Sequence, residues 1–208
     1  MHPPLVGGER IEAIIPLGYQ PILDFTVERT HCYWTSGVLH HNTGKSELGA
    51  LEMACHLTGR YPDWWNGRRF NAPVRAWAAG DTSKTVRGIV QVKLLGPAGQ
   101  TGTGMIPADA IHHISRSSTP DAFDSVWVKH ESGGLSSLEL KSYEQGRKAF
   151  QGTTLEVIWL DEEPDEAIYT ECLMRTITTN GLVYLTFTPL QGVTQLILSF
   201  LRNELVAA

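Results

Sequence analysis

The alternation of strand-type and helix-type segments after residue 42 is the feature that most constrains the fold. Apolar runs at 74–82, 154–164 and 181–189 are typical of buried strands, and segments with a helical period lie between them. Parallel strands need a crossover, usually a helix, and such helices cover both faces of the sheet. The alternation therefore predicts an α/β domain with a mostly parallel sheet over residues 43–208.

Turn and capping residues mark the ends of the helices in this domain. Gly59 closes a predicted helix that begins at Thr43, and Thr82 or Ser83 is placed to cap a helix over 84–95. Further helices are predicted over 166–177 and 193–205, and shorter strands over 110–114, 125–130 and 137–142.

The first 42 residues differ in character from the rest. Three runs, 10–18, 20–28 and 30–41, are rich in Ile, Val, Thr and aromatic residues and lack a helical period. This pattern predicts a small all-β segment. The boundary between the two predicted domains, 1–42 and 43–208, has no Pro/Gly/Ser linker.

Composition and charge exclude several classes of protein. The net charge of −5 argues against a chain coated in basic residues for nucleic-acid binding, but not against a local basic patch. The three cysteines are far apart and lack metal-binding spacing, which is typical of reduced cytoplasmic proteins. No signal region opens the sequence and no apolar run approaches the length of a membrane span, so we expect a cytoplasmic protein without a membrane partner.

The sequence GVLHHNTGKSELGA, at 37–50, contains the second half of a phosphate-binding loop. The full motif is G-x-x-x-x-G-K-[ST], and Gly44, Lys45 and Ser46 supply its end. Backbone N–H groups at the helix start hold phosphate oxygens, Lys45 reaches the β- and γ-phosphates of ATP, and the Ser46 hydroxyl ligates Mg²⁺. Leu39 occupies the position of the first glycine, so the front of the loop is missing.

A matching acidic motif follows in the strand LEVIWLDEEP, at 155–164. Strands of an α/β sheet end where ligands bind, so Asp161 is placed to hold the Mg²⁺ shell. Glu162 is placed to polarise the attacking water. The alternative is a buried strand followed by an acidic turn that caps a helix. The presence of both motifs, in order, in one α/β chain favours a nucleotide site.

Three further candidates have structural alternatives. Thr186 and Thr188 lie at the exit of the strand over 181–189 and could sense the γ-phosphate. Threonines also favour strands for their own sake, and for Thr186 we prefer that interpretation. Arg147 could neutralise transition-state charge across a subunit boundary, with a solvated helix arginine as the alternative.

Three collinear segments resemble the ATPase domain of phage terminase large subunits, the motors that package DNA into capsids. They are TGRYPDWWNGRRFNAPVRAWAAGDT, KSYEQGRKAFQGTTLEVIWLDEEP and VYLTFTPLQG, and the resemblance covers residues 43–200. It implies an ATPase that uses ATP and Mg²⁺ and works as a homo-oligomeric ring. It also implies double-stranded phage DNA, a capsid portal and a small terminase subunit as partners.

The same resemblance implies roles for individual residues. Glu162 would be catalytic, Thr188 would couple hydrolysis to movement, and the nucleotide and its Mg²⁺ would be held by Thr43, Gly44, Lys45, Ser46 and Asp161. Two parts of the family pattern are missing from the sequence. The adenine-binding segment and loop front should precede Thr43, and a nuclease domain should follow the ATPase.

The residues around the missing loop front suit a self-cleaving reaction. The side-chain amide of Asn42 can attack its own carbonyl, forming a succinimide and breaking the peptide bond, while His41 donates a proton to the leaving amide. The hydroxyl of Thr43 can accept an acyl group beforehand. By itself, His-Asn-Thr is more usually a polar turn.

The longer segment ILDFTVERTHCYWTSGVLHHNT resembles the C-terminal splicing motif of inteins, whose fold is all-β and of the Hint type. The resemblance covers residues 8–42 and implies that Asn42 cyclises with help from His41 and His31. It also implies that Asp24 assists the preceding ester step. The positions that fall on the pattern are Asp24, His31, Trp34, Gly37, His41, Asn42 and Thr43.

Together the two resemblances predict a trans-splicing precursor. An N-terminal intein piece on another polypeptide would carry the front of the loop, and the ATPase would be competent only after ligation to Thr43. A truncated chain would give the same sequence. The alternative function is a stand-alone P-loop ATPase with an N-terminal β binding module and an atypical phosphate loop.

Overall fold

The computed structural model describes residues 32–35, 38–41, 44–188, 194–198 and 200. They fall into two compact units, the first reaching residue 43 and including 63–66, the second comprising 44–62 and the residues from 67 onward. The predicted strand runs at 10–18 and 20–28 lie outside the described residues.

The described part of the first unit is a β-hairpin. β1 (Cys32–Thr35) and β2 (Val38–His41) pair antiparallel, with Cys32 opposite His41 and Thr35 opposite Val38. These two strands form a sheet of their own. β2 ends three positions before Gly44 in the sequence.

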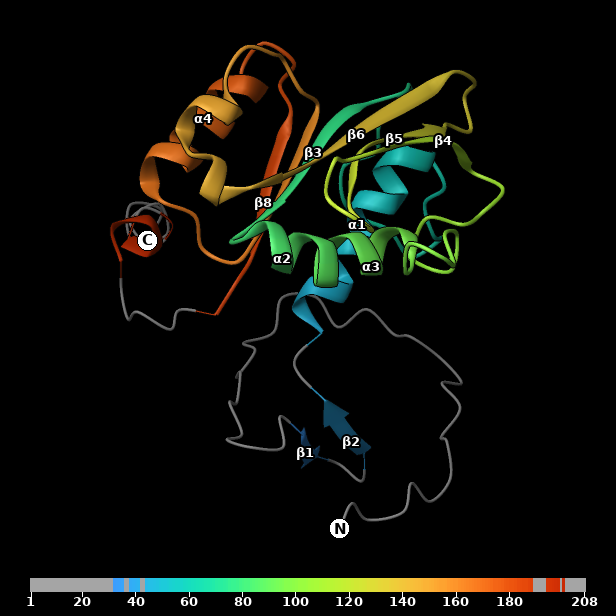
Figure 1. Cartoon of the computed structure of the whole chain (residues 1–208), viewed down its shortest axis with the longest axis horizontal. Coiled ribbons are helices and arrows are strands. Elements are labelled where there is room, and N and C mark those ends of the chain that lie inside the picture. The colour runs from blue at the N-terminus through green and yellow to red at the C-terminus, as the bar shows by residue number, and fades with distance from the viewer. Residues whose placement is uncertain (1–31, 36–37, 42–43, 189–193, 199, 201–208) are drawn as a thin grey trace. The chain divides into compact units, whose positions relative to one another are not determined.

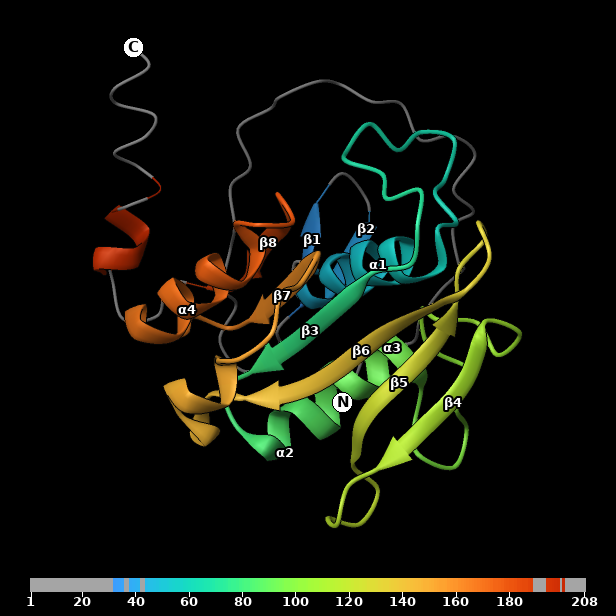
Figure 2. The ribbon, with the colours of Figure 1, turned by 90° about the horizontal axis from the view of Figure 1, so that it is seen from above.

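The second unit is built on a six-stranded sheet with the order β4-β5-β6-β3-β7-β8 (Figures 1 and 2). Its strands are β3 (Arg75–Gly80), β4 (Ile111–Arg116), β5 (Phe123–Lys129), β6 (Leu135–Ser142), β7 (Val157–Asp161) and β8 (Leu182–Thr186). β6, β3, β7 and β8 run parallel, as predicted. β4 and β5 pair antiparallel, as do β5 and β6, because the short connections between them cannot form the crossover that parallel strands require.

Side chains alternate along the central strands and divide the core between the two faces of the sheet. α1 (Lys45–Thr58) and α3 (Gln91–Leu95) pack on one face, which carries Ala76, Ala78, Val157 and Trp159. α4 (Glu166–Thr176) and the 3₁₀ helix η3 (Arg147–Phe150) pack on the other, which carries Trp77, Ala79, Ile158 and Leu160. In Figure 1, α4 lies on one side of the strands and α2 and α3 lie on the other.

The helix boundaries follow the predicted caps. Gly59 ends α1 with a left-handed φ of 72° and donates its N–H to the carbonyl of Cys55 at 2.9 Å. Thr82 caps α2 (Ser83–Thr85) through a reciprocal pair of hydrogen bonds with Thr85. α2 continues through a π-helical turn, η1 (Val86–Val90), into α3. The sequence did not predict this turn. Of the predicted helix over 193–205, residues 194–198 and 200 are described, and all of these except Thr194 are helical.

The carboxyl ends of the parallel strands meet at one edge of the sheet. Gly80, at the end of β3, lies opposite Ser142 at the end of β6, and Asp161 of β7 lies opposite Thr186 of β8. Ligand sites of open α/β sheets form at this edge. None of the helices in the described ranges is long and apolar enough to cross a membrane.

Candidate active site

A hydrogen bond between the first turn of α1 and the end of β7 defines the candidate site. Ser46 donates its Oγ hydroxyl to Oδ1 of Asp161 at 2.7 Å, although 115 positions separate the two residues in sequence. These are the two residues that the sequence predicts as ligands of one Mg²⁺ ion. Hydroxyl and carboxylate oxygens are the hard donors that Mg²⁺ prefers, so the residues present fit this ion.

Magnesium sites at nucleotides use few protein ligands, because phosphate oxygens and water complete the octahedron. The described residues contain no cluster of three or more His, Cys, Asp or Glu side chains suited to hold a metal ion. Ser46 and Asp161 would supply the protein's share of the coordination sphere.

The start of α1 provides donors for an anion beside this pair. Gly44 is its N-cap, with a left-handed φ of 72°, and the helix begins with Lys45. The first N–H groups of a helix lack partners within the helix and carry the positive end of its dipole. Phosphate oxygens bind readily to such an end, and Lys45 adds a full positive charge there.

Asp161 is held by a second hydroxyl that comes from β8. Thr186 donates its Oγ1 hydroxyl to Oδ1 of Asp161 at 2.7 Å and accepts the indole N–H of Trp159 at 2.7 Å. The residue as a whole is only 4% exposed. This burial raises the pKa of Asp161, and the hydroxyls of Thr186 and Ser46 offset part of the rise.

Thr186 is therefore a site residue that our sequence interpretation missed. Strand propensity alone accounts for a threonine at this position in the sequence, yet Thr186 ties β8 to the acidic end of β7. The sequence could have indicated this role by position alone, because Thr186 lies at the carboxyl end of the strand that follows the acidic strand. Thr188, two residues further on and predicted to couple hydrolysis to movement, is half-buried.

Glu162 follows Asp161 in an unusual backbone conformation. Its φ of 68° lies in the left-handed region that residues with a Cβ rarely adopt. Its N–H donates to the carbonyl of Thr186 at 2.9 Å. Partial desolvation and the neighbouring charge of Asp161 raise the pKa of Glu162, while Lys45 lowers it. A carboxyl with a raised pKa is better matched to proton transfer near neutral pH.

Asp81 adds a further negative charge to this edge. It follows β3 directly, and its charge also raises the pKa of Glu162. From the sequence alone, this segment predicts a helix cap at Thr82 or Ser83 and no role for Asp81. The position of Asp81 at the end of a central parallel strand marks it as part of the same edge.

A close contact fixes α1 against β7. A Cβ atom on Gly49 would lie 2.6 Å from Cε2 of Trp159, so only glycine fits there without displacement. Tyr184 of β8 donates its hydroxyl to the carbonyl of Gly49 at 2.8 Å, and its ring stacks on Trp159 with an interplanar angle of 6°. These contacts set the position of Ser46 relative to Asp161.

Arg147 lies on η3 and is engaged by an acid of α4. Its guanidinium donates to Oε1 of Glu171 from Nε at 2.9 Å and from Nη2 at 2.6 Å, and its side chain remains 60% exposed. Arg175 also faces Glu171, at 3.6 Å. Within this chain, Arg147 serves as a partner of Glu171.

Most of the predicted splicing residues fall outside the described ranges. This applies to Asp24, His31, Gly37, Asn42 and Thr43. Trp34 lies in β1 and His41 is the last residue of β2. The splicing roles of these residues remain predictions.

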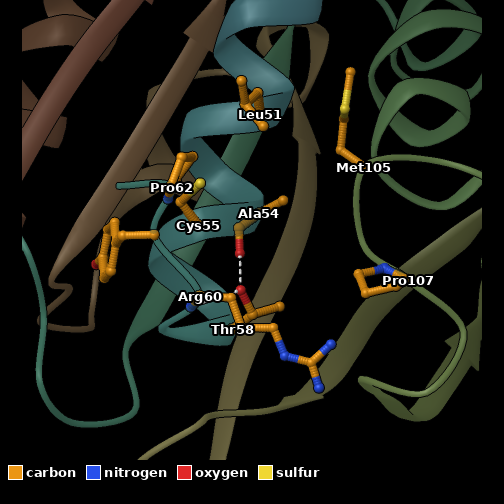
Figure 3. Close-up of a pocket in the computed structure, with 9 residues that line it drawn as sticks. Leu51, Ala54, Cys55, Thr58, Arg60, Pro62, Met105 and Pro107 are labelled. Atoms are coloured by element: carbon orange, nitrogen blue, oxygen red, sulfur yellow. Dashed lines mark hydrogen bonds between the residues drawn. The ribbon is translucent and has the colours of Figure 1, made fainter. Parts of the chain in front are cut away.

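A separate cavity of 340 Å³ lies toward the other end of α1 (Figure 3). Its lining is mostly apolar and comprises Leu51, Ala54, Cys55, Thr58, Arg60, Tyr61, Pro62, Met105 and Pro107. The Thr58 hydroxyl donates to the carbonyl of Ala54 at 2.6 Å. Burial raises the pKa of the Cys55 thiol to about 11, which keeps it protonated and unreactive at neutral pH.

Comparison with known proteins identifies a family for most of the chain. Residues 41–207 match the family described as "Terminase large subunit, T4likevirus-type, N-terminal". The large terminase subunit of Salmonella phage P22 is 39% identical over an alignment of 181 residues, which covers 77% of this chain and 36% of that protein. The chain thus spans well under half the length of this relative.

Two solved structures of the large terminase ATPase domain of Thermus phage P74-26 are also similar. One is 18% identical and covers 71% of this chain and 56% of its own, with a TM-score of 0.45. The other, an arginine-to-alanine mutant, is 17% identical and covers 74% of this chain and 58% of its own, also with a TM-score of 0.45.

Proposed function

The chain belongs to the T4likevirus-type family of terminase large subunits, matching its N-terminal part, and on that premise we propose that residues 44–188 are the ATP-hydrolysing region of a DNA-packaging motor. The hydrogen bond from Ser46 to Asp161 carries this proposal, because it joins the two halves of a nucleotide and Mg²⁺ site. The proposed partners are double-stranded phage DNA, a portal, a small terminase subunit and further copies of the chain in a ring.

Each residue at the carboxyl edge has a role in this proposal. The N–H groups at the start of α1 and the Lys45 ammonium bind the phosphates, and Ser46 and Asp161 orient Mg²⁺. When bound, Mg²⁺ neutralises charge on the β- and γ-phosphates. Glu162 accepts a proton from the water that attacks the γ-phosphorus, and its raised pKa suits that transfer.

Thr188 and Arg147 have proposed roles beyond this chemistry. Thr188 lies just past β8, whose Thr186 contacts Asp161, so movement of this strand would report changes at the metal site. Arg147 would reach the nucleotide of a neighbouring subunit only by leaving Glu171. Assembly of the ring would therefore have to compete with that ion pair.

We further propose that the front of the phosphate loop is supplied by a second polypeptide through splicing. A phosphate loop joins a strand of the sheet to the following helix. In the described part of the second unit, no strand precedes α1 in the chain. In the first unit, β2 extends to His41 and leaves two positions before Gly44, whereas the motif needs four residues between its first glycine and Gly44.

β8 is suited to accept the missing strand. It is the last strand in the sheet order, its residues are half-buried, and its sequence LVYLT has neither charge nor proline. Leu182 donates its N–H to the carbonyl of Glu156, just before β7, and the carbonyl of Thr186 accepts the N–H of Glu162, just after it. The alternate residues Val183 and Leu185 therefore direct their backbone groups outward. Such an edge readily adds a further strand.

The proposed splicing step breaks the peptide bond between Asn42 and Thr43. The hydroxyl of Thr43 first attacks the ester or thioester that joins the partner's segment to the N-terminal intein piece, assisted by Asp24. The acyl group moves to the Thr43 oxygen, and the hydroxyl or thiol of the intein piece leaves. The side-chain nitrogen of Asn42 then attacks the Asn42 carbonyl carbon. This attack forms a succinimide and releases the Thr43 amine, which receives a proton through His41 with help from His31. The neutral amine then attacks the ester carbonyl, so that the acyl group moves from the Thr43 oxygen to its nitrogen, the hydroxyl is restored and a peptide bond results.

The test combines ligation with hydrolysis. The full chain is incubated with N-terminal intein pieces preceded by a strand and the sequence G-x-x-x, so that Thr43 becomes the fourth variable residue of the loop, and products are weighed by mass spectrometry. We expect a ligated product that begins with the partner's segment and continues at Thr43, lost in N42A, and ATP hydrolysis only after ligation. Robust hydrolysis by the unligated chain would instead support the stand-alone ATPase with an atypical loop.

A further inference from the structure

The hydroxyl of Tyr143 meets the backbone of both acidic residues of the candidate site. It lies 3.1 Å from the carbonyl oxygen of Asp161 and 3.0 Å from that of Glu162. Tyr143 comes directly after β6, which is two strands away from β7 in the sheet. β3 lies between them, and its Ala79 belongs to the apolar cluster against which Tyr143 packs.

Tyr143 is itself held in place. The turn that it opens, η2 (Tyr143–Gln145), is capped by Ser142, whose N–H donates to Oε1 of Gln145 at 3.2 Å. The phenol ring lies against Phe150, with centroids 6.3 Å apart. Burial raises the pKa of Tyr143 well above its usual range, so its hydroxyl remains a proton donor.

The tyrosine completes a clamp on the backbone of Glu162. The N–H of Glu162 donates to the carbonyl of Thr186, and its carbonyl accepts from Tyr143. The φ of 68° between these two bonds is disfavoured for glutamate and needs such support from its surroundings. The direction of the carboxylate follows from this backbone conformation, because φ fixes where the Cβ points.

We propose that Tyr143 is a positioning residue for ATP hydrolysis, acting through the backbone of Glu162. Its hydroxyl keeps Glu162 in the left-handed conformation that aims the carboxylate at the attacking water. This inference rests on the proposed function of the site. It differs from that function in assigning a role to a residue that touches neither nucleotide nor metal.

The first test measures hydrolysis by the ligated protein. Tyr143→Phe should lower kcat about tenfold, since small displacements of a catalytic group cost up to about a hundredfold, and should leave KM for ATP within about twofold. Tyr169→Phe, which alters a half-buried tyrosine of α4 lying against Phe200, should keep full activity. p-Aminophenylalanine at position 143 retains a donor and should restore the rate.

A double-mutant cycle separates positioning from general damage. If Tyr143 acts through Glu162, Tyr143→Phe should have no further effect in the Glu162→Gln background. An equal further loss in that background, or an unchanged kcat in Tyr143→Phe alone, would overturn the inference. Full hydrolysis by Glu162→Gln would overturn the proposed function, and with it this inference.

The second test uses the full chain without ligation. A crystal structure of Tyr143→Phe should show Glu162 with a negative φ, because one side of the clamp is gone. Retention of the left-handed conformation would overturn the inference even if splicing and hydrolysis proceed as proposed.

Discussion

The two ends of α1 differ in what their residues can do. At its start, Gly44, Lys45 and Ser46 present N–H groups, a charge and a hydroxyl to the acidic end of β7. Towards its other end, Leu57 is fully buried and the neighbouring cavity is lined mostly by apolar side chains. One helix therefore serves chemistry at its start and stability at its end, and substitutions at the two ends should have separable effects.

The largest effect is expected at the chemical end. Glu162→Gln removes the proposed general base, and general-base catalysis contributes about 10²- to 10⁴-fold, so hydrolysis by the ligated protein should fall by about that factor. Glu163→Gln is the matched control, because this adjacent acid instead accepts a hydrogen bond from Thr194. Steady-state ATPase rates check both. Similar losses in the two variants would show that the site is misassigned.

At the stabilising end, Leu57→Ala should lower the free energy of unfolding by about 2–5 kcal/mol, as for other fully buried leucines. The rate of hydrolysis per folded molecule should stay unchanged. Leu48→Ala on the same helix, at 60% exposure, should change stability by less than about 0.5 kcal/mol. Urea unfolding measures both. A loss of kcat in Leu57→Ala well below its melting temperature would contradict the separation of the two ends.

Between the two ends, Gly49→Ala should affect both stability and rate. Its Cβ would press on Trp159, and overpacking of this kind costs about 1–3 kcal/mol. Displacement of α1 should also weaken the approach of Ser46 to Asp161 and lower kcat. Gly88→Ala is the control, since a Cβ there meets nothing within 4 Å. We expect that variant to be neutral or more stable by about 0.4–1 kcal/mol in chemical denaturation.

The smallest expected effect is a displacement of the pH profile. Glu162 must be ionised to accept a proton, and its pKa is raised. Hydrolysis should therefore decline as pH falls, with a midpoint above the usual glutamate value of about 4.3. Asp81→Asn removes a charge that contributes to the raised pKa, so the midpoint should move down. Rates from pH 4 to 8, compared between wild type and this variant, test the sign of the shift.

Local features of the second unit could be predicted because each depends on neighbouring residues. Gly59 and Thr82 end and begin helices through their own backbone or side-chain chemistry. The apolar run that ends in Asp161 is a buried strand because its residues are apolar on both faces. Ser46 and Asp161 could be paired in advance because the two motifs of a phosphate site are recognisable one at a time.

Other features depend on which strands become neighbours and in which register. Thr186 meets Asp161 because β8 pairs with β7, and Tyr143 meets Glu162 because β6 lies two strands from β7. The Gly49–Trp159 contact joins a helix and a strand that are far apart in the chain. Periodicity along a sequence does not encode sheet order. The sequence by itself thus determined the kinds of elements and the two phosphate-site motifs, whereas the tertiary structure decided which side chains support them, since those contacts arise only when the sheet is assembled.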